Sequence, residues 1–173
     1  KLDKEAWQRH FRSYLDMNKD AVDGKLGENG ISYVLVDSYE AAHQNWTPRL
    51  REEFIQRRGY DPLLWYPVLT GLILHSPEQS ERFLWDWRKT IGELFEENFA
   101  VLDKFVKEEY GMKGCYVESH GNGRAFIADG MSMKSHCDFP MSEIWIQGKV
   151  GTQNRAQEGI SDIRESSSVA HIY

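Results

Sequence analysis

The chain of 173 residues lacks several features, and each absence excludes a class of protein. No run approaches the roughly 20 apolar residues that cross a bilayer, so we expect no membrane span. No secretory signal opens the chain, which begins with Lys1 rather than Met and is expected to belong to a longer protein. Basic residues are not in excess: 21 Lys and Arg are interleaved with 27 Asp and Glu, giving a net charge of −6. Nucleic acid is therefore not an expected partner.

Cysteine is scarce, and the two present, Cys115 and Cys137, do not have the spacing of metal ligands. Two buried thiols are the expected arrangement, because free cysteine is commonly buried, and one disulfide is the alternative. Internal repeats, low-complexity tracts and linkers are also absent. With 40% hydrophobic residues, residues 1–173 are interpreted as a fragment of one domain with no internal boundary.

Aromatic side chains are abundant, at 13% of the residues with six tryptophans among them. Tryptophan presents a large flat apolar face that stacks on sugar rings, but it also fills protein cores. The composition therefore favours carbohydrate binding only weakly.

Helical and strand patterns alternate along the chain. An apolar stripe with a spacing of three or four residues predicts a long helix from the cap Ser76 to Gly111. Apolar runs rich in β-branched residues predict strands at 31–36, 113–117 and 138–146. The other predictions are a helix from Asp3 to near Gly24, a helix capped by Thr47 that ends at Gly59, a proline-containing loop at 61–71, a loop at 147–160 and a last helix from near Ser161.

Carboxylates accompany all three predicted strands: Asp37 and Glu40 follow the first, Glu118 follows the second, and Glu143 lies in the third. Helices between the strands require crossover connections, so the strands are expected to be parallel neighbours. The carboxyl ends of parallel strands share one face, where active sites are built. The acids are therefore predicted to converge on one pocket.

Three βα units are too few to close a barrel, which needs eight strands and typically ~250 residues. The glycine fingerprint of a dinucleotide-binding sheet does not follow the first strand. The fold class is therefore interpreted as α/β, a partial (β/α)8 TIM-type barrel of about three βα units with parallel strands.

Polar and aromatic residues surround these acids in the sequence. Glu40 is followed by His43, Asn45 and Trp46, the kinds of side chain that hydrogen-bond to a sugar and stack on it. Each has a simpler alternative: a loop acid exposed to solvent, a helix cap or a tryptophan in the core. The same choice applies to Glu118 with His120, and to Glu143 with Trp145.

Oxygen ligands could also hold a hard cation near these strand ends. Asp37, Glu118 and Glu143 would suit calcium, whereas zinc would need a Cys or His cluster that the sequence lacks.

Six runs, in chain order, are similar to one family of enzymes. They are Val36-Asp37-Ser38-Tyr39-Glu40, Gln44-Asn45-Trp46-Thr47-Pro48, Arg57-Arg58-Gly59-Tyr60-Asp61-Pro62, Ser80-Glu81-Arg82-Phe83-Leu84-Trp85-Asp86, Asp138-Phe139-Pro140-Met141-Ser142-Glu143-Ile144-Trp145 and Ala170-His171-Ile172-Tyr173. In these runs the chain resembles the catalytic barrel of glycoside hydrolase family 106, the α-L-rhamnosidases. The resemblance extends over nearly the whole chain.

The resemblance implies inverting hydrolysis of terminal α-L-rhamnosides from plant or bacterial polysaccharides and glycosides. It also implies a calcium ion near the sugar hydroxyls, an extracytoplasmic (periplasmic or secreted) location, and completion of the barrel by the rest of the parent protein. Glu40 matches the general acid, and the base is either Glu143 or a glutamate on a strand beyond Tyr173. The expected substrate contacts are Asp37, His43, Asn45, Trp46, Glu118, His120 and Trp145.

Two other functions remain open at this point. A non-catalytic carbohydrate-binding barrel would keep the aromatic residues and lose the acids, all of which are present here. A metal hydrolase acting on other bonds would favour histidine ligands at metal spacing, which the sequence does not contain.

Overall fold

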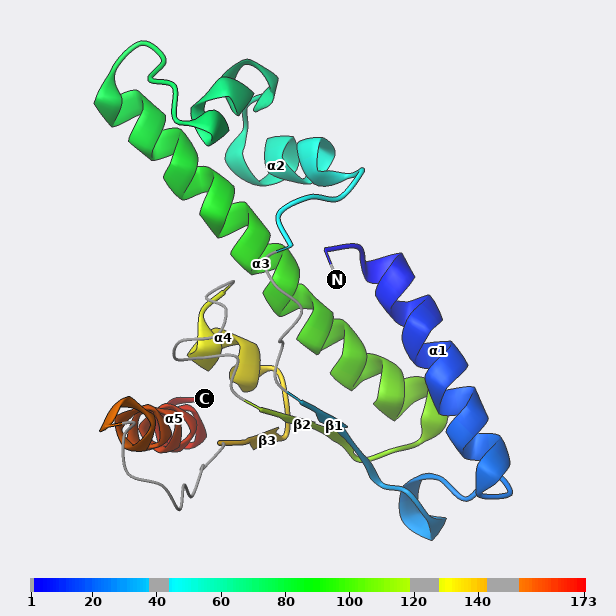
Figure 1. The fold of residues 1–173 in the computed structure, drawn as a ribbon. Coiled ribbons are helices and arrows are strands. Elements are labelled where there is room, and N and C mark those ends of the chain that lie inside the picture. Colours follow the sequence, from blue (N-terminus) through cyan, green and yellow to red (C-terminus); the bar gives the residue numbers. More distant parts are fainter. Residues whose placement is uncertain (1, 38–43, 119–127, 143–152) are drawn as a thin grey trace.

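The computed structural model describes the backbone of residues 2–37, 44–118, 128–142 and 153–173. Figure 1 shows one long helix crossing the molecule, with a small sheet and the other helices packed along it. The elements in chain order are α1 (Lys4–Ala21), η1 (Gly27–Asn29), β1 (Tyr33–Val36), α2 (Leu50–Arg58), η2 (Leu63–Thr70), α3 (Pro77–Tyr110), β2 (Gly114–Val117), α4 (Gly130–Ser135), β3 (Phe139–Pro140) and α5 (Gln153–Ile172), where η marks a 3-10 helix.

The three strands form one parallel sheet in the order β1-β2-β3. Tyr33 of β1 pairs with Gly114 of β2, and Val36 with Val117. Val117 in turn pairs with Pro140 of β3. The prediction of three parallel neighbours separated by helices is confirmed, with α2, η2 and α3 in the first crossover and α4 in the second.

Helix α3 begins and ends where the sequence predicts. The hydroxyl of Ser76 accepts a hydrogen bond from the backbone N–H of Gln79 at 3.2 Å, and Pro77 occupies the first turn. At the other end Gly111 takes the left-handed conformation, with φ of 63°, as a C-terminal glycine does. These two caps fix a helix of 34 residues, long enough to pass beneath the sheet and continue beyond it.

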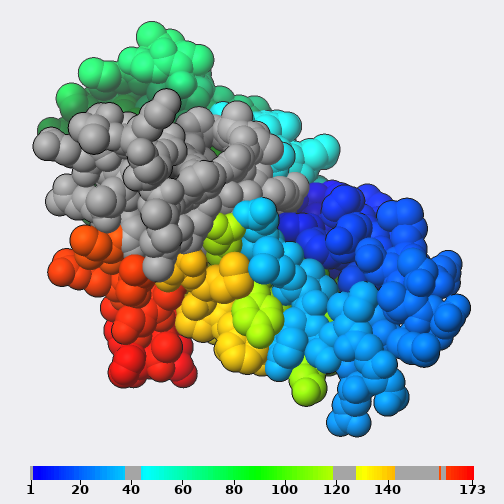
Figure 2. Space-filling model, turned by 60° about the horizontal axis from the view of Figure 1, so that its bottom comes forward, coloured from blue at the N-terminus to red at the C-terminus, as the bar shows by residue number. Residues whose placement is uncertain are grey.

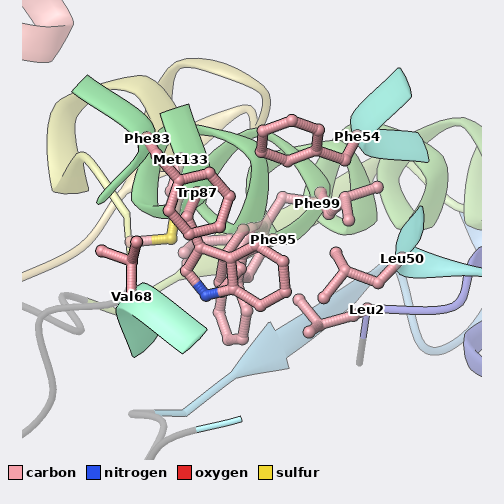
Figure 3. Close-up of a cluster of buried hydrophobic side chains, with 12 residues drawn as sticks. Leu2, Leu50, Phe54, Val68, Phe83, Trp87, Phe95, Phe99 and Met133 are labelled. Atoms are coloured by element: carbon pink, nitrogen blue, oxygen red, sulfur yellow. The ribbon is translucent and has the colours of Figure 1, made fainter. Parts of the chain in front are cut away.

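The inward face of α3 joins two buried clusters. The first cluster contains Phe95, Phe99 and Val117, together with Leu50 and Phe54 of α2. Figure 3 shows Leu2, from the start of the chain, beside Leu50, with the ring of Trp87 between them and Phe83. The second cluster lies under the amino-terminal part of the sheet and contains Leu15, Val34, Leu102, Phe105, Val106, Met112 and Cys115.

The opposite face of the sheet carries aromatic and aliphatic side chains close to the surface. Tyr116 stacks on Phe139 with ring centroids 4.5 Å apart, and Tyr33 meets both rings edge-on. Leu35 is 57% exposed on this face and Phe139 is 40% exposed. Figure 2 shows β1, β2 and β3 at the surface side by side, in light blue, yellow-green and yellow. Strands of parallel sheets are normally covered on both faces, so this apolar face differs from the usual arrangement.

Several sequence-based boundaries are wrong at helix starts. The helix predicted to be capped by Thr47 begins at Leu50, because the carbonyl of Thr47 accepts from Leu50 N at 3.0 Å and closes a turn first. The predicted loop at 61–71 contains the 3-10 helix η2, whose first N–H, that of Leu63, donates to Asp61 at 2.9 Å. Proline is compatible with a 3-10 helix, although it argues against an α-helix.

The carboxyl-terminal third differs most from prediction. The third strand has only two residues, Phe139–Pro140, and α4 was not predicted, although Asp129 caps it through Met131 N at 2.9 Å. Helix α5 begins at Gln153 rather than near Ser161. Polar composition favoured a loop there, but Ala, Gln, Glu and Arg are also strong helix formers. The first helix ends at Ala21, three residues before Gly24.

Candidate functional site at the carboxyl ends of the strands

The backbone pairing brings three chain segments together where the strands end. Glu118 N donates to Val36 O at 3.0 Å, and Met141 N donates to Val117 O at 2.9 Å. These two bonds continue the ladder by one residue beyond β2 and β3. Asp37, Glu118 and Met141, the first residues after β1, β2 and β3, therefore lie at one edge of the sheet.

Asp37 and Glu118 are the two candidate acids that the structure describes, and they occupy neighbouring positions. Each comes directly after a strand, one step beyond the paired residues Val36 and Val117. Glu118 is only 6% exposed, whereas Asp37 is exposed. A carboxyl group buried at a strand end is costly unless it is bonded, so it commonly marks a position with a specific role.

Trp46 is the described aromatic candidate, and it is 57% exposed. Its ring centroid lies 5.8 Å from that of Tyr66 in an edge-on contact and 6.4 Å from that of Trp87. Trp87 is buried in the first cluster, so Trp46 is anchored on one side and open on the other. Asn45, beside it in the chain, is exposed. An indole exposed to this extent does not fit the alternative of a tryptophan in the core, and it could serve as a stacking surface.

The end of β3 is held by a buried network from α4 and α5. Lys134 is 1% exposed, and its ammonium group lies 2.9 Å from a Glu165 oxygen and donates to Ser166 Oγ at 2.9 Å. Ser166 Oγ donates to Met141 O at 2.7 Å. A buried lysine needs such partners, and here they tie α5 to the residue that follows β3.

The remaining predicted site residues lie outside the described residues. They are Glu40 and His43 after β1, His120 after β2, and Glu143 and Trp145 after β3. Their catalytic, metal-binding and substrate-binding roles stay predictions.

Metal binding at this edge stays a prediction. In the parts of the chain that the structure covers, no group of three or more His, Cys, Asp or Glu residues is placed to hold a metal ion. Asp37 and Glu118 supply two neighbouring carboxylates of the type that calcium prefers. Glu143, the third predicted ligand, is not described.

The cysteines do not add thiolate ligands to this edge. Cys115 and Cys137 are both free, so the predicted alternative of a disulfide is wrong. Burial, followed by the charges of Asp103 and Asp138, raises the pKa of Cys115 to about 12. Burial also raises the pKa of Cys137. Both thiols stay protonated at neutral pH, which disfavours nucleophilic and metal-binding roles.

A second acidic group lies near the amino-terminal end of β2. Lys107 Nζ donates to Asp103 at 2.7 Å and to Asp138 at 3.1 Å. Burial raises the pKa of Asp103; burial opposes ionisation of Asp138 as well, but hydrogen bonds from Lys107 hold the pKa of Asp138 below its usual value. A Cβ on Gly114 would lie 1.6 Å from Asp138 Oδ2, so no ligand fits between them. This group has a structural role.

One aromatic hollow was missed by the sequence analysis. It lies between η2 and the amino-terminal end of α3, and Tyr60, Trp65 and Trp85 are among its lining residues. The available signal was Trp85, which stands outside the apolar stripe of α3, two residues before the buried Trp87. A tryptophan off the buried stripe of a helix has its ring free for another contact.

A parallel sheet with crossover helices and a buried acid at a strand end defines part of an α/β domain. The family profile of glycoside hydrolase family 106, described as α-L-rhamnosidase, matches residues 1–173. The chain belongs to this family.

Two relatives agree with this assignment to the glycoside hydrolases. The solved structure of a rhamnosidase from Novosphingobium sp. PP1Y superimposes with a TM-score of 0.86 at 36% identity, over 98% of this chain and 16% of that one. A protein named "Putative beta-glucuronidase" from Formosa agariphila is 34% identical over 125 residues, which is 72% of this chain and 10% of the relative. The chain thus spans between a tenth and a sixth of these relatives. None of its described helices is long and apolar enough to cross a membrane.

Proposed function

We propose that the chain forms part of the active site of an inverting α-L-rhamnosidase that removes terminal rhamnose from glycans and glycosides. The observation that carries the proposal is the parallel sheet itself, because it brings Asp37, Glu118 and the segment after β3 to one edge. Membership of family 106 and the likeness to the Novosphingobium rhamnosidase support the choice of substrate.

The sheet is proposed to belong to a (β/α)8 barrel completed by the rest of the parent protein. Helix α3 packs on one face, as the outer helices of a barrel do. The other face, with Leu35 and Phe139 exposed, has the bulky apolar side chains that fill a barrel interior. Closing the barrel would remove both the exposed face and the open strand edges.

In the proposed reaction two carboxyl groups perform opposite tasks. Glu40, three residues after Asp37 in the sequence, donates a proton to the leaving oxygen. An ionised carboxylate, Glu143 or a residue beyond Tyr173, removes a proton from the attacking water on the far side of the ring. The two groups of an inverting enzyme stand about 6.5–9.5 Å apart, which leaves room for that water.

The other predicted residues hold the sugar in this proposal. Trp46 offers an exposed indole face on which the ring can stack, and Asn45 lies beside it to hydrogen-bond with hydroxyls. His43, His120 and Trp145 are proposed as further contacts on the segments that follow the strands.

Calcium is proposed as a ligand of the same edge. Asp37 and Glu118 would hold it together with Glu143, and the ion would orient two sugar hydroxyls. Carboxylate oxygens of this kind are the ligands that calcium prefers.

The function is tested by supplying the full-length parent with an aryl α-L-rhamnoside and with an aryl β-D-glucuronide, and following the product anomer by NMR. We expect hydrolysis of the rhamnoside, with β-L-rhamnose as the first product because inversion converts the α anomer. Cleavage of the glucuronide alone would refute the rhamnosidase assignment. Retention of the α anomer would refute the inverting mechanism.

Removal of the metal gives a separate expected result. Exhaustive chelation of the full-length parent should raise KM for the aryl rhamnoside, and added calcium should restore it, because the ion orients the hydroxyls. Glu118→Ala should reproduce the chelated state, whereas Glu108→Ala, which changes an exposed acid in the last turn of α3, should leave calcium dependence unchanged. Full activity after chelation, with no bound metal by elemental analysis, would leave these acids in direct contact with the sugar.

A further inference from the structure

The aromatic hollow between η2 and α3 has a volume of about 650 Å³, within the range of ligand sites. Four aromatic side chains line it: Tyr60 after α2, Trp65 of η2, and Phe83 and Trp85 of α3. Trp85 is 67% exposed, so a large apolar face lies open to solvent. Three polar side chains of α3 complete the lining: Gln79, Arg82 and Asp86.

The walls of the hollow are held in place by packing and hydrogen bonding. Trp65 stacks on the buried Phe83, with ring centroids 5.8 Å apart and an interplanar angle of 19°. Tyr60 Oη donates to Asp86 Oδ2 at 3.0 Å. Burial, and then the bond to Asp86, raise the pKa of Tyr60, which therefore remains a hydrogen-bond donor at neutral pH. A site with preset side chains loses little conformational entropy on binding.

The chemistry of these walls matches a pyranose ring. One side of such a ring is a patch of C–H groups, which packs against an aromatic face. Its rim carries neighbouring hydroxyls, which suit side chains with paired donors or acceptors: the guanidinium of Arg82, the amide of Gln79 and the carboxylate of Asp86. A flat apolar ligand would not use these three polar groups.

The lining of the hollow includes none of the predicted strand-end residues. Two ring contacts connect it to Trp46: the rings of Trp46 and Trp87 have centroids 6.4 Å apart, and those of Trp87 and Phe83, which lines the hollow, are 5.9 Å apart. A glycan longer than one sugar could therefore contact both Trp46 and the hollow.

We propose that the hollow binds a sugar ring of a glycan chain at a distance from the bond that is cleaved. This proposal rests on the proposed function, since it assumes that the parent protein acts on carbohydrate. Binding here would increase the affinity for long substrates and leave the chemistry on small glycosides unchanged.

The test uses the full-length parent with Trp85→Ala and two polymers, one of alternating rhamnose and galacturonate and one a neutral rhamnan. Binding is measured by calorimetry in a Glu40→Gln background, and kcat/KM for an aryl rhamnoside in the wild-type background. We expect Kd for at least one polymer to rise about tenfold, with kcat/KM for the aryl rhamnoside changed by less than about twofold. Leu64→Ala, which removes an exposed apolar side chain of η2 outside the lining, is the matched control.

A second pair of variants identifies the kind of sugar. Arg82→Ala should weaken binding, whereas Arg88→Ala, an exposed arginine further along α3 and outside the lining, should not. If Arg82→Ala weakens binding of the acidic polymer alone, Arg82 contacts a uronate carboxylate. If it weakens binding of both polymers, Arg82 contacts sugar hydroxyls. Either result supports sugar binding in the hollow.

Unchanged polymer binding in Trp85→Ala would overturn the proposal. If Trp85→Ala lowers the thermal stability of the parent and leaves polymer binding intact, the hollow is a contact with another part of that protein and the proposal also fails. Tryptophan-dependent polymer binding in a parent that does not cleave the aryl rhamnoside would refute the proposed activity alone. The two failures are therefore distinguishable.

Discussion

Glu40→Gln in the full-length parent should lower kcat/KM for rhamnosides with poor leaving groups by about 10²–10⁴-fold. The glutamine cannot donate a proton, so an alkoxide would have to leave unassisted. An activated aryl rhamnoside needs no such proton, and we expect it to keep much of its rate. The measurement is the ratio of kcat/KM for the two substrates in the variant and in the wild type.

The control for this substitution is Glu81→Gln, which changes an exposed acid on the surface of α3. It should leave the rates on both substrates unchanged. Equal loss on both substrates in Glu40→Gln would remove Glu40 from the acid role and would favour a role in binding. Rescue of the poor substrate by small carboxylic acids would strengthen the assignment, because an external acid can supply the missing proton.

The parallel sheet could be predicted because its signals are local and its connections are constrained. The run from Tyr33 to Val36 is continuous and apolar, and long helical patterns separate it from Gly114–Val117. A helix between two strands favours a crossover connection and therefore parallel pairing. The order of the elements thus predicted the topology of the sheet. Helix α3 could be predicted equally well. Ser76 is a typical N-cap residue, and Gly111 is typical of the position that ends a helix in the left-handed conformation.

Other elements depend on tertiary contacts that the local sequence does not indicate. Strand β3 has two residues, and its place in the sheet depends on pairing with Val117 and on the bond from Ser166 to Met141. Both partners are distant in the sequence. Helix α5 begins in a polar stretch in which composition alone favours a loop. The predicted start of this helix was therefore eight residues too late.

The candidate site was predictable only in part for a related reason. A carboxylate after an apolar run predicts a strand end, and Asp37 and Glu118 stand there in register. The sequence does not tell whether such an acid is buried, yet Glu118 is 6% exposed and Asp37 is exposed. The hollow was not foreseen because Tyr60, Trp65 and Trp85 come from three segments that only tertiary packing brings together.

Phe99→Ala should cost about 3–5 kcal/mol in the stability of the sheet, the largest structural effect we expect. Phe99 is 1% exposed and belongs to the cluster that contains Phe95 and Val117 and is contacted by Val36. Truncation would leave a cavity beneath the two strand ends from which Asp37 and Glu118 continue. Loss of support there should loosen the candidate site as well as the core.

Hydrogen exchange of the full-length parent measures this effect locally, through the amides of residues 33–37 and 114–118. A loss of 3 kcal/mol corresponds to more than about 100-fold faster exchange where these amides open through unfolding of the sheet. Leu64→Ala removes an aliphatic side chain that is 80% exposed, and exchange in the sheet should then stay as in the wild type. Equal protection in the two variants would mean that the rest of the parent, rather than the α3 cluster, holds the strand ends in place.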